Sequence, residues 1–225
     1  MKKKAVVLLS GGLDSSTALY WAKAKNYDCE GLSIFYGQRH ERELDSARAV
    51  AKKARIKTHE IRLDLPWLKT SSLADKNKKL PNLPLSKIGH GPIPSTYVPG
   101  RNTVFLSLAL SLADATKAQA IVVGANALDY SGYPDCRPDY LNAFERAARL
   151  GTKIGAMGRS IKILSPLLRL DKEKIVRLAL KLKVPLELTW SCYAGKKHPC
   201  GKCDSCKLRA KGFLLAKAHD PALKA

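Results

Sequence analysis

The sequence predicts an α/β fold, in which a Rossmann-like, doubly wound parallel sheet is followed by a C-terminal metal-binding segment. Three observations support this prediction. Short apolar runs alternate with amphipathic helical patterns, a glycine-rich turn follows the first apolar run, and four of the six cysteines lie between residues 192 and 206. The 225 residues, 45% of them hydrophobic, are enough to bury a full core. We expect a main α/β domain at residues 1–184 and a four-cysteine segment at residues 185–225.

The first part of the chain has the pattern of a β-α-β-α-β unit. An apolar run with paired valines suits a buried parallel strand, and it ends at a Ser-Gly-Gly turn that neither strand nor helix favours. Apolar residues then recur at three- and four-residue steps, as in a helix that packs on a sheet. Such alternation implies right-handed crossovers and a parallel sheet covered on both faces. The expected elements are strands at residues 4–9, 31–36 and 58–63 and helices at residues 14–26 and 41–55.

The middle of the chain departs from this regularity. Residues 65–100 carry six prolines and little periodicity, so we expect a long irregular excursion of the kind that often covers a substrate. Residues 103–117 are apolar nearly all round, which predicts a helix buried in the core. Asp171 is a plausible N-cap for a later helix. The remaining expected elements are strands at residues 120–124 and 161–164 and helices at residues 138–150 and 171–183.

The chain is strongly basic. Forty Lys and Arg against nineteen Asp and Glu give a formal charge of +21, which favours anionic partners such as nucleotides, phosphorylated substrates or RNA. A solvated basic surface explains the charge equally well, because the lysines are scattered. No apolar run reaches the length of a membrane span, and the lysine-rich N-terminus leads into a Gly/Ser turn instead of a cleavage site. We therefore expect a cytoplasmic protein that does not contact a membrane.

A glycine-rich loop, Ser10-Gly11-Gly12-Leu13-Asp14-Ser15-Ser16, joins the first strand to the first helix. Unpaired backbone N–H groups at the positive end of a helix favour an anion. The two glycines let a polyphosphate approach the main chain, and the three serine hydroxyls can donate to its oxygens. Asp14 would repel phosphate unless a divalent cation lies between them, which suggests Mg²⁺. The alternative is an ordinary turn in which Asp14 only caps the helix.

Four cysteines form the second candidate site. Two overlapping Cys-x-x-Cys steps and one more distant thiol suit tetrahedral Zn²⁺, and nearby lysines would offset the charge of four thiolates. The spacing also permits an iron–sulfur cluster, but nothing near it suggests electron transfer. Four protein ligands leave the ion no open position, so we expect a structural role. The ligands are Cys192, Cys200, Cys203 and Cys206.

These motifs resemble a known family. The loop at residues 10–16 is similar to the signature of the PP-loop ATP pyrophosphatases, whose fold is of the adenine nucleotide alpha hydrolase-like type. Other segments resemble one branch of that family, the QueC family of 7-cyano-7-deazaguanine synthases. They are Tyr36-Gly37-Gln38-Arg39-His40, Val98-Pro99-Gly100-Arg101-Asn102, Ser131 to Arg137, Thr189-Trp190-Ser191-Cys192-Tyr193, and the cysteine-rich run at residues 200–210.

The resemblance implies an ATP-dependent carbon–nitrogen ligase. Such an enzyme joins ammonia to 7-carboxy-7-deazaguanine and dehydrates the resulting amide to the nitrile preQ0, in queuosine or archaeosine biosynthesis. It implies ATP and Mg²⁺ at the loop, one structural Zn²⁺ per chain, and a homodimer. The expected ATP-binding residues are Leu8, Leu9, Ser10, Gly11, Gly12, Leu13, Asp14, Ser15, Ser16, Thr17 and Ala18.

Roles for other residues follow from the same resemblance. Asp14 is expected to face Mg²⁺, and Arg101 to stabilise developing phosphate or carboxylate charge, unless it is an ordinary surface arginine. Tyr133, Asp135 and Arg137 could recognise the deazaguanine by stacking, accepting and donating hydrogen bonds, or could simply shape a turn around a proline.

Two other functions fit parts of the sequence. A PP-loop enzyme that modifies tRNA directly, a thiolase or a lysidine-type ligase, would suit the charge of +21. Against it, no RNA-binding domain is apparent and the cysteines are committed to one ion, so we do not expect direct tRNA binding. A non-enzymatic zinc-ribbon protein could bind nucleic acid through the basic tail, but it would not need the phosphate loop.

Overall fold

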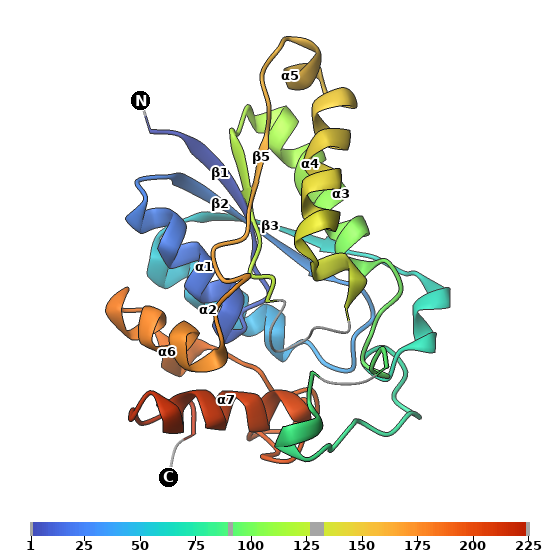
Figure 1. Ribbon diagram of the computed structural model, residues 1–225, viewed down its shortest axis with the longest axis vertical. Coiled ribbons are helices and arrows are strands. Elements are labelled where there is room, and N and C mark those ends of the chain that lie inside the picture. Colours follow the sequence, from blue (N-terminus) through green and yellow to red (C-terminus); the bar gives the residue numbers. More distant parts are fainter. Residues whose placement is uncertain (1, 90–91, 127–132, 224–225) are drawn as a thin grey trace.

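The computed structural model describes residues 2–89, 92–126 and 133–223. A parallel sheet lies at its centre (Figure 1), with the strand order β3-β2-β1-β4-β5. The chain runs outward from β1 to β3 and then returns to the other side of β1 through β4. The order therefore reverses between β1 and β4, the place where parallel α/β sheets bind ligands. The strands are β1 (Lys4–Leu8), β2 (Asp28–Phe35), β3 (Lys57–Arg62), β4 (Ala120–Val122) and β5 (Lys162–Leu164).

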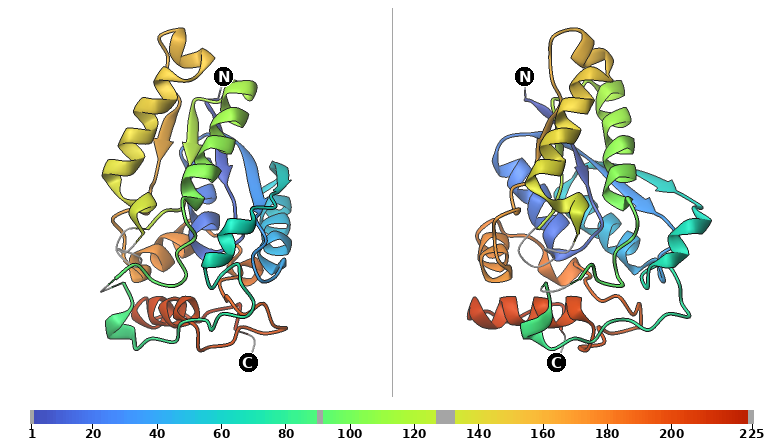
Figure 2. Two further views of the ribbon diagram at one scale, coloured as in Figure 1. Left: turned by 90° about the vertical axis from the view of Figure 1, so that its right-hand side faces the viewer. Right: turned by 45° about the vertical axis from the view of Figure 1, so that its right-hand side comes forward.

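Helices cover both faces of this sheet, as Figure 2 shows from two further sides. One layer contains α1, α2, α6 and α7, and the opposite layer contains α3 and α4, with the short α5 beside α4. This arrangement confirms the predicted doubly wound fold. The helices are α1 (Leu13–Ala24), α2 (Arg42–Ala54), α3 (Arg101–Thr116), α4 (Pro138–Leu150), α5 (Lys153–Ala156), α6 (Lys172–Lys181) and α7 (Asp204–Leu215).

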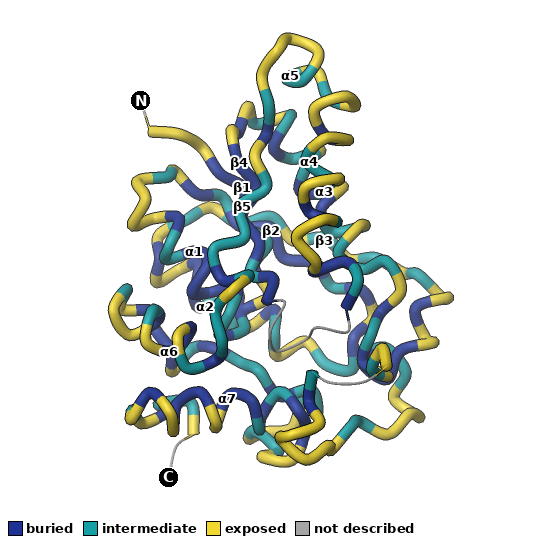
Figure 3. Tube along the Cα trace, in the orientation of Figure 1, coloured by how far each residue is buried: buried dark blue, intermediate teal, exposed yellow. Residues whose placement is uncertain are grey.

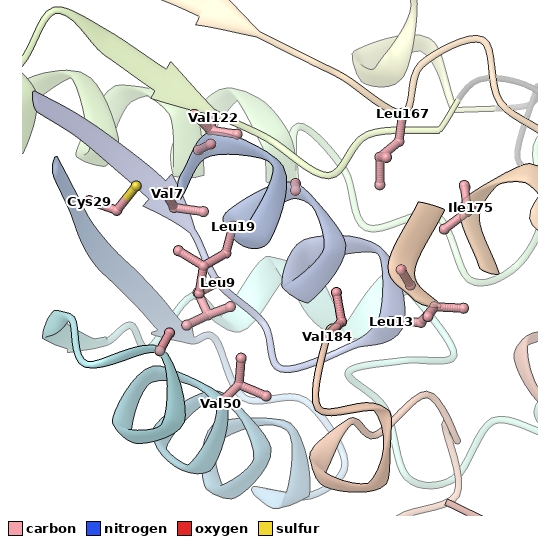
Figure 4. Packing of buried hydrophobic residues seen from close by; sticks show 14 of the residues in the cluster. Val7, Leu9, Leu13, Leu19, Cys29, Val50, Val122, Leu167, Ile175 and Val184 are labelled. Carbon is pink, nitrogen blue, oxygen red and sulfur yellow. The ribbon is translucent and has the colours of Figure 1, made fainter. Parts of the chain in front are cut away.

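Two apolar clusters hold the layers together. Successive side chains of a strand point to opposite faces, so Val7 packs under α1 and α2 whereas Val6 packs under α3. Figure 3 shows that the central strands are buried along most of their length. Figure 4 shows part of the first cluster, which contains Val7, Leu19 and Val50 and also Ile175 from α6. The site at the sheet edge is thus supported by a packed core on both sides.

The elements expected from the sequence are present, with ends that differ by at most three residues. The irregular excursion is confirmed, broken only by the short 3₁₀ helices η1 (Pro66–Thr70) and η2 (Leu85–Lys87). Helix α3 differs from the expectation of full burial, because its outer face with Thr103, Ser107 and Ser111 is exposed. It covers the sheet instead of passing through the core. None of the helices in the described ranges has the length and hydrophobicity that crossing a membrane requires.

The C-terminal region contains a helix that the cysteine pattern does not predict. After η4 (Leu186–Leu188), the cysteine-rich segment leads into α7, which packs against α6. Phe213 and Ala216 join the same core cluster as β1 and α1. The start of α7 also contacts η2 in the excursion, where the amide of Leu83 donates to Asp204 at 2.9 Å. The proposed boundary between residues 184 and 185 stays a prediction.

Candidate active site

A cavity of about 270 Å³ opens at the carboxyl ends of β1 and β4, where the strand order reverses. Its walls combine the loop after β1, the ends of β2 and β4, the first turns of α2 and α3, and the segment that precedes the cysteines. Segments from both ends of the chain therefore meet around one space. Within the predicted ATP-binding range, the residues that line it are Leu8, Leu9, Ser10, Gly12, Leu13, Asp14 and Ser15.

The loop after β1 is held by its own serines. The hydroxyls of Ser10 and Ser15 lie 3.0 Å apart, and the Ser15 hydroxyl accepts from the amide of Ser10 at 3.2 Å. Gly12 is the N-cap of α1 and offers no side chain to its first turn. The first amides of α1 therefore point toward the cavity without a capping oxygen, as an anion site requires. Gly11, Ser16, Thr17 and Ala18 lie behind this surface and do not line the cavity.

Close approach of neighbouring elements explains two of the glycines. Gly11 has φ +78°, and a Cβ there would lie 2.4 Å from the amide of Ala47 and 2.5 Å from the carbonyl oxygen of Glu43. A Cβ at Gly124 would lie 2.9 Å from the backbone of Ser15. The phosphate loop thus packs closely against the start of α2 and the end of β4. These contacts fix the path of its backbone.

Asp14 forms an ion pair in this site. The ammonium of Lys172, at the start of α6, donates to both carboxylate oxygens of Asp14 at 2.8 and 2.9 Å. The side chains are 9% and 23% exposed, so the pair is largely shielded from water. Both residues line the cavity. Asp14 therefore faces the expected phosphate position, with a cation beside it that the sequence did not indicate.

Arg101 lines the same cavity as the loop. As the first residue of α3, it places its guanidinium carbon 6.0 Å from the ring centre of Tyr36 and 5.9 Å from that of Phe105. It forms no ion pair with any carboxylate in the described part of the chain. An arginine that is always charged and lines a cavity without a carboxylate partner is suited to bind an anion. Arg101 is therefore not an ordinary surface arginine.

The three residues expected to contact the deazaguanine lie in different environments. Tyr133 is buried, lines the cavity, and shares a 2.6 Å hydrogen bond between its hydroxyl and that of Thr96. Asp135 is buried but accepts from the amide of Asn102 at 3.0 Å and does not line the cavity. Arg137 is exposed at the N-cap of α4, also outside the cavity. Their assigned roles stay predictions, and residues 131–132 of the same motif lie outside the described ranges.

The four cysteines form one cluster. Their sulfur atoms all lie within 4.8 Å of one another. Tetrahedral zinc with bonds of about 2.3 Å places sulfurs about 3.8 Å apart, so the set fits a zinc site. The amides of Cys200 and Ala194 donate to the sulfur of Cys192 at 3.3 and 3.4 Å, as is usual around metal thiolates. Hydrogen bonds from Cys203 and Cys206 hold the pKa of the Cys192 thiol well below its usual range.

The cysteine cluster is joined to the phosphate loop by direct contacts. The amide of Trp190 donates to the carbonyl oxygen of Gly11 at 2.9 Å. The carbonyl oxygen of Cys192 accepts from the indole N–H of Trp190 at 2.8 Å and contacts the His40 ring at 3.1 Å. The guanidinium of Arg42 lies 5.2 Å from the Trp190 ring centre. A rigid cysteine segment would therefore fix both the loop and the wall of the cavity.

Comparison with known proteins decides the family. The family model described as "Queuosine biosynthesis protein QueC" matches residues 4–217, a range that includes the phosphate loop and all four clustered cysteines. The chain belongs to the QueC family.

Individual relatives of the QueC family match over almost their whole length. The 7-cyano-7-deazaguanine synthase of Nostoc punctiforme is 52% identical over 224 residues, which cover 99% of this chain and 100% of that protein. The enzyme of the same name from Thermoplasma volcanium is 50% identical over 221 residues, covering 98% and 90%. The predicted family is therefore confirmed by relatives from two different organisms.

A solved structure confirms the fold outside the QueC family. A 4-thiouridine synthetase, crystallised with RNA and ATP, superposes with a TM-score of 0.52 at 19% identity, over 96% of this chain and 50% of that one. At this identity the likeness concerns the fold alone. It agrees with the α/β fold that the sequence predicts.

Among the cavity residues absent from the predicted site are three with charged side chains: Lys172, Glu43 and Arg209. Lys172 and Glu43 occupy the first turns of amphipathic helices, where charged residues usually face solvent. Arg209 lies in the cysteine-rich run at residues 200–210, which the cysteine spacing assigns to the metal site. The sequence does not indicate that these three residues line the cavity, because their place in the site depends on how α2, α6 and α7 pack around the loop.

Proposed function

We propose that this chain is an ATP-dependent ligase that converts 7-carboxy-7-deazaguanine and ammonia to the nitrile 7-cyano-7-deazaguanine in queuosine biosynthesis. One observation carries the proposal: the QueC family match extends over residues 4–217, and within that range the phosphate loop opens into a cavity at the switch point of the sheet. The near-complete coverage of the Nostoc punctiforme synthase supports the same activity for the whole chain.

The chemistry explains why such an enzyme needs ATP twice. A carboxylate is a poor electrophile, and its oxygen is a poor leaving group. Transfer of a phosphorus group from ATP to that oxygen lets ammonia attack the carbon, and the oxygen then leaves with the phosphorus group to give the amide. The same activation of the amide oxygen lets it leave as the carbon–nitrogen triple bond forms. One loop could serve both steps, because both substrates present an oxygen at the same carbon.

The cavity supplies candidate groups for these steps. We assign the amides at the start of α1 to the ATP phosphates and Arg101 to the charge that develops on the activated oxygen. Tyr133 is our candidate for stacking on the deazaguanine, since it is an aromatic residue that lines the cavity. Lys172 would exchange its bond to Asp14 for one to a phosphate oxygen, because it already reaches the loop.

Two metal ions accompany this assignment. Asp14 presents hard carboxylate oxygens to the cavity and would hold Mg²⁺ together with phosphate oxygens and water; the ion would neutralise phosphate charge. The four clustered cysteines would hold one structural Zn²⁺. The resemblance to the family further suggests a homodimer in the cytoplasm.

Substitution of Asp14 tests the role of the loop. We expect Asp14→Asn to lower ATP-dependent turnover by about 100-fold or more, because the neutral amide cannot hold a cation. The amide still accepts from Lys172, so the fold and the zinc content should be retained. Asp45→Asn is the matched control, since Asp45 lies on the exposed face of α2 and pairs with Arg48. Equal activity of Asp14→Asn and wild type would contradict the assignment.

The charge of +21 keeps one alternative open to experiment, a PP-loop enzyme that acts on tRNA directly. A gel-shift titration with tRNA at physiological salt, beside turnover of free carboxy-deazaguanine, separates the two. Small-molecule turnover with weak, salt-sensitive tRNA binding supports the proposed ligase. Tight tRNA binding without small-molecule turnover would favour the alternative.

A further inference from the structure

A carboxylate without a partner faces the cavity from the first turn of α2. Glu43 lines the cavity and is half-buried. Its side chain forms no hydrogen bond or ion pair with another described residue. The acidic residues on either side differ: Glu41 pairs with Arg62 at 2.8 Å, and Asp45 pairs with Arg48 at 3.0 Å, both on the exposed surface. Glu43 is thus the inward-facing acid of this turn.

Glu43 lies directly beside the phosphate loop. A Cβ built on Gly11 would approach the carbonyl oxygen of Glu43 to 2.5 Å, so the two backbones are in contact. The charge of Arg101 acts on the Glu43 carboxylate from the start of α3, and Tyr36 at the end of β2 shares the same surroundings. Glu43 therefore contacts the phosphate loop through its backbone, and its carboxylate lies within electrostatic reach of the expected anion-binding arginine.

The environment gives this carboxylate a proton affinity suited to neutral pH. Burial raises the pKa of Glu43 to about 7, and the positive charge of Arg101 opposes the shift. The other charged or ionisable side chains that line the cavity are Asp14, Tyr36, Arg39, His40, Arg101, Tyr133, Cys136, Lys172, Tyr193 and Arg209. A base with a pKa near the working pH transfers protons most effectively in both directions.

The proposed reaction needs such a base. At neutral pH ammonia exists mainly as ammonium, which has no lone pair with which to attack carbon. We propose that Glu43 is the catalytic base that binds ammonium in the cavity, removes one proton, and so releases the nucleophile beside the activated carboxylate. This assignment rests on the proposed function and names the group that handles the nitrogen.

The protons balance over the two half-reactions. In the first, Glu43 takes one proton from ammonium, the nitrogen bonds to carbon, and the activated oxygen leaves with its phosphorus group. The nitrogen then releases a second proton to water, and the neutral amide results. In the second, the carbon–oxygen bond of the activated amide breaks while the nitrogen loses its last two protons, one to Glu43 and one to water. After each half-reaction Glu43 returns its proton to solvent, so the carboxylate is ionised again when the next proton is removed.

The test compares Glu43→Gln with Glu41→Gln, an exposed glutamate two residues earlier that does not line the cavity. We expect Glu43→Gln to lower kcat/KM for ammonia by about 100-fold or more, and Glu41→Gln to leave it within about threefold of wild type. Activation of the carboxylate is measured separately, without ammonia, as the transfer of ¹⁸O from labelled carboxylate to the phosphorus product. This step should persist in Glu43→Gln.

Hydroxylamine distinguishes a base from a residue that only shapes the cavity. It is largely unprotonated at neutral pH, so it should form the hydroxamate in Glu43→Gln at a rate within about tenfold of wild type. Equal loss of the ammonia and hydroxylamine reactions would overturn the proposal, as would an unchanged ammonia reaction. Absence of carboxylate activation in the wild type would instead refute the proposed function.

The pH profile of the wild type supplies a test that needs no variant. If Glu43 deprotonates ammonium, kcat/KM for total ammonia should rise with pH and level off above about 7, where Glu43 is ionised. If free ammonia enters unaided, the value should keep rising about tenfold per pH unit through the same range. The second result would overturn the assignment even if Glu43→Gln failed to fold.

Discussion

Lys172 and Asp14 illustrate how single charged residues shape this site. Their ion pair is largely shielded from water, and each charge offsets part of the cost of burying the other. Glu43 differs from this pair, because its half-buried carboxylate forms no ion pair with a described cation. The fold tolerates this unpaired carboxylate at the cavity, where ammonium is expected to provide the missing positive charge. Glu43 is thus electrostatically incomplete in the free protein, whereas Asp14 is not.

A measurable consequence concerns Glu43 and stability. Its pKa is raised from an ordinary value of 4.5 to about 7 in the folded protein. Between these values the unfolded chain has lost the proton while the folded protein retains it, so rising pH favours unfolding. We expect Glu43→Gln to gain about 1–3 kcal/mol relative to wild type on going from pH 5 to pH 8. Urea unfolding of both proteins at the two pH values measures this, and a pH-independent difference would contradict it.

Only part of this residue-level picture can be predicted from the sequence. Asp14 and Arg101 were expected at the site because they lie in recognisable loops, and both line the cavity. Lys172 reaches Asp14 from 158 residues further along the chain. No local pattern reports such a contact, since it arises from the packing of α6 beside the phosphate loop.

At the scale of elements, the cysteine-rich segment forms part of the active-site wall. Its first residues bond to the phosphate loop, and α7 at its end packs on α6 and enters the main core. Periodicity predicted α2, α4 and α6, which have one clear apolar face. Helix α7 was missed because its apolar residues are spread around the helix and its start overlaps the cysteine pattern. Helix α7 contributes to the core, but it was not predicted because the residues at its start were assigned to the metal site.

Loss of one cysteine tests the metal at this segment. We expect Cys203→Ser to lower the zinc content of the purified protein and to lower Tm by roughly 5–10 °C, because the ion contributes to folding. Atomic absorption and thermal unfolding measure the two effects together. Cys29→Ser is the control, since Cys29 is a buried cysteine outside the cluster. Unchanged zinc stoichiometry in Cys203→Ser would refute the assignment.

A buried ion pair joins α7 to the end of the chain. Arg209 donates to both oxygens of Asp220 at 2.6 and 2.8 Å, with side chains 8% and 3% exposed, and also donates to the hydroxyl of Thr189. We expect Arg209→Met to lower the free energy of unfolding by about 3–5 kcal/mol, because Asp220 would stay buried without a cation. Lys211→Met, on the exposed face of the same helix, should cost no more than about 0.5 kcal/mol. Comparable urea midpoints for the two variants would contradict this account.

At the scale of the whole molecule, the strand order explains where the chemistry occurs. Alternating strands and helices predicted a parallel sheet, and the sheet places its switch point beside the glycine-rich loop. The sequence could not show that the excursion at residues 65–100 and the C-terminal segment would meet below this edge, where Lys207 donates to the carbonyl oxygen of Leu83 at 2.7 Å. Such contacts between distant irregular segments leave no periodic pattern in the chain.

The central claim is that this one cavity turns a carboxylate into a nitrile. Mass spectrometry of the products from 7-carboxy-7-deazaguanine, ¹⁵N-labelled ammonia and ATP tests it most directly. We predict a transient amide followed by the nitrile, each carrying one ¹⁵N atom, with both steps dependent on ATP. Recovery of unchanged carboxylate, or an amide that never proceeds to the nitrile with ATP in excess, would contradict the account.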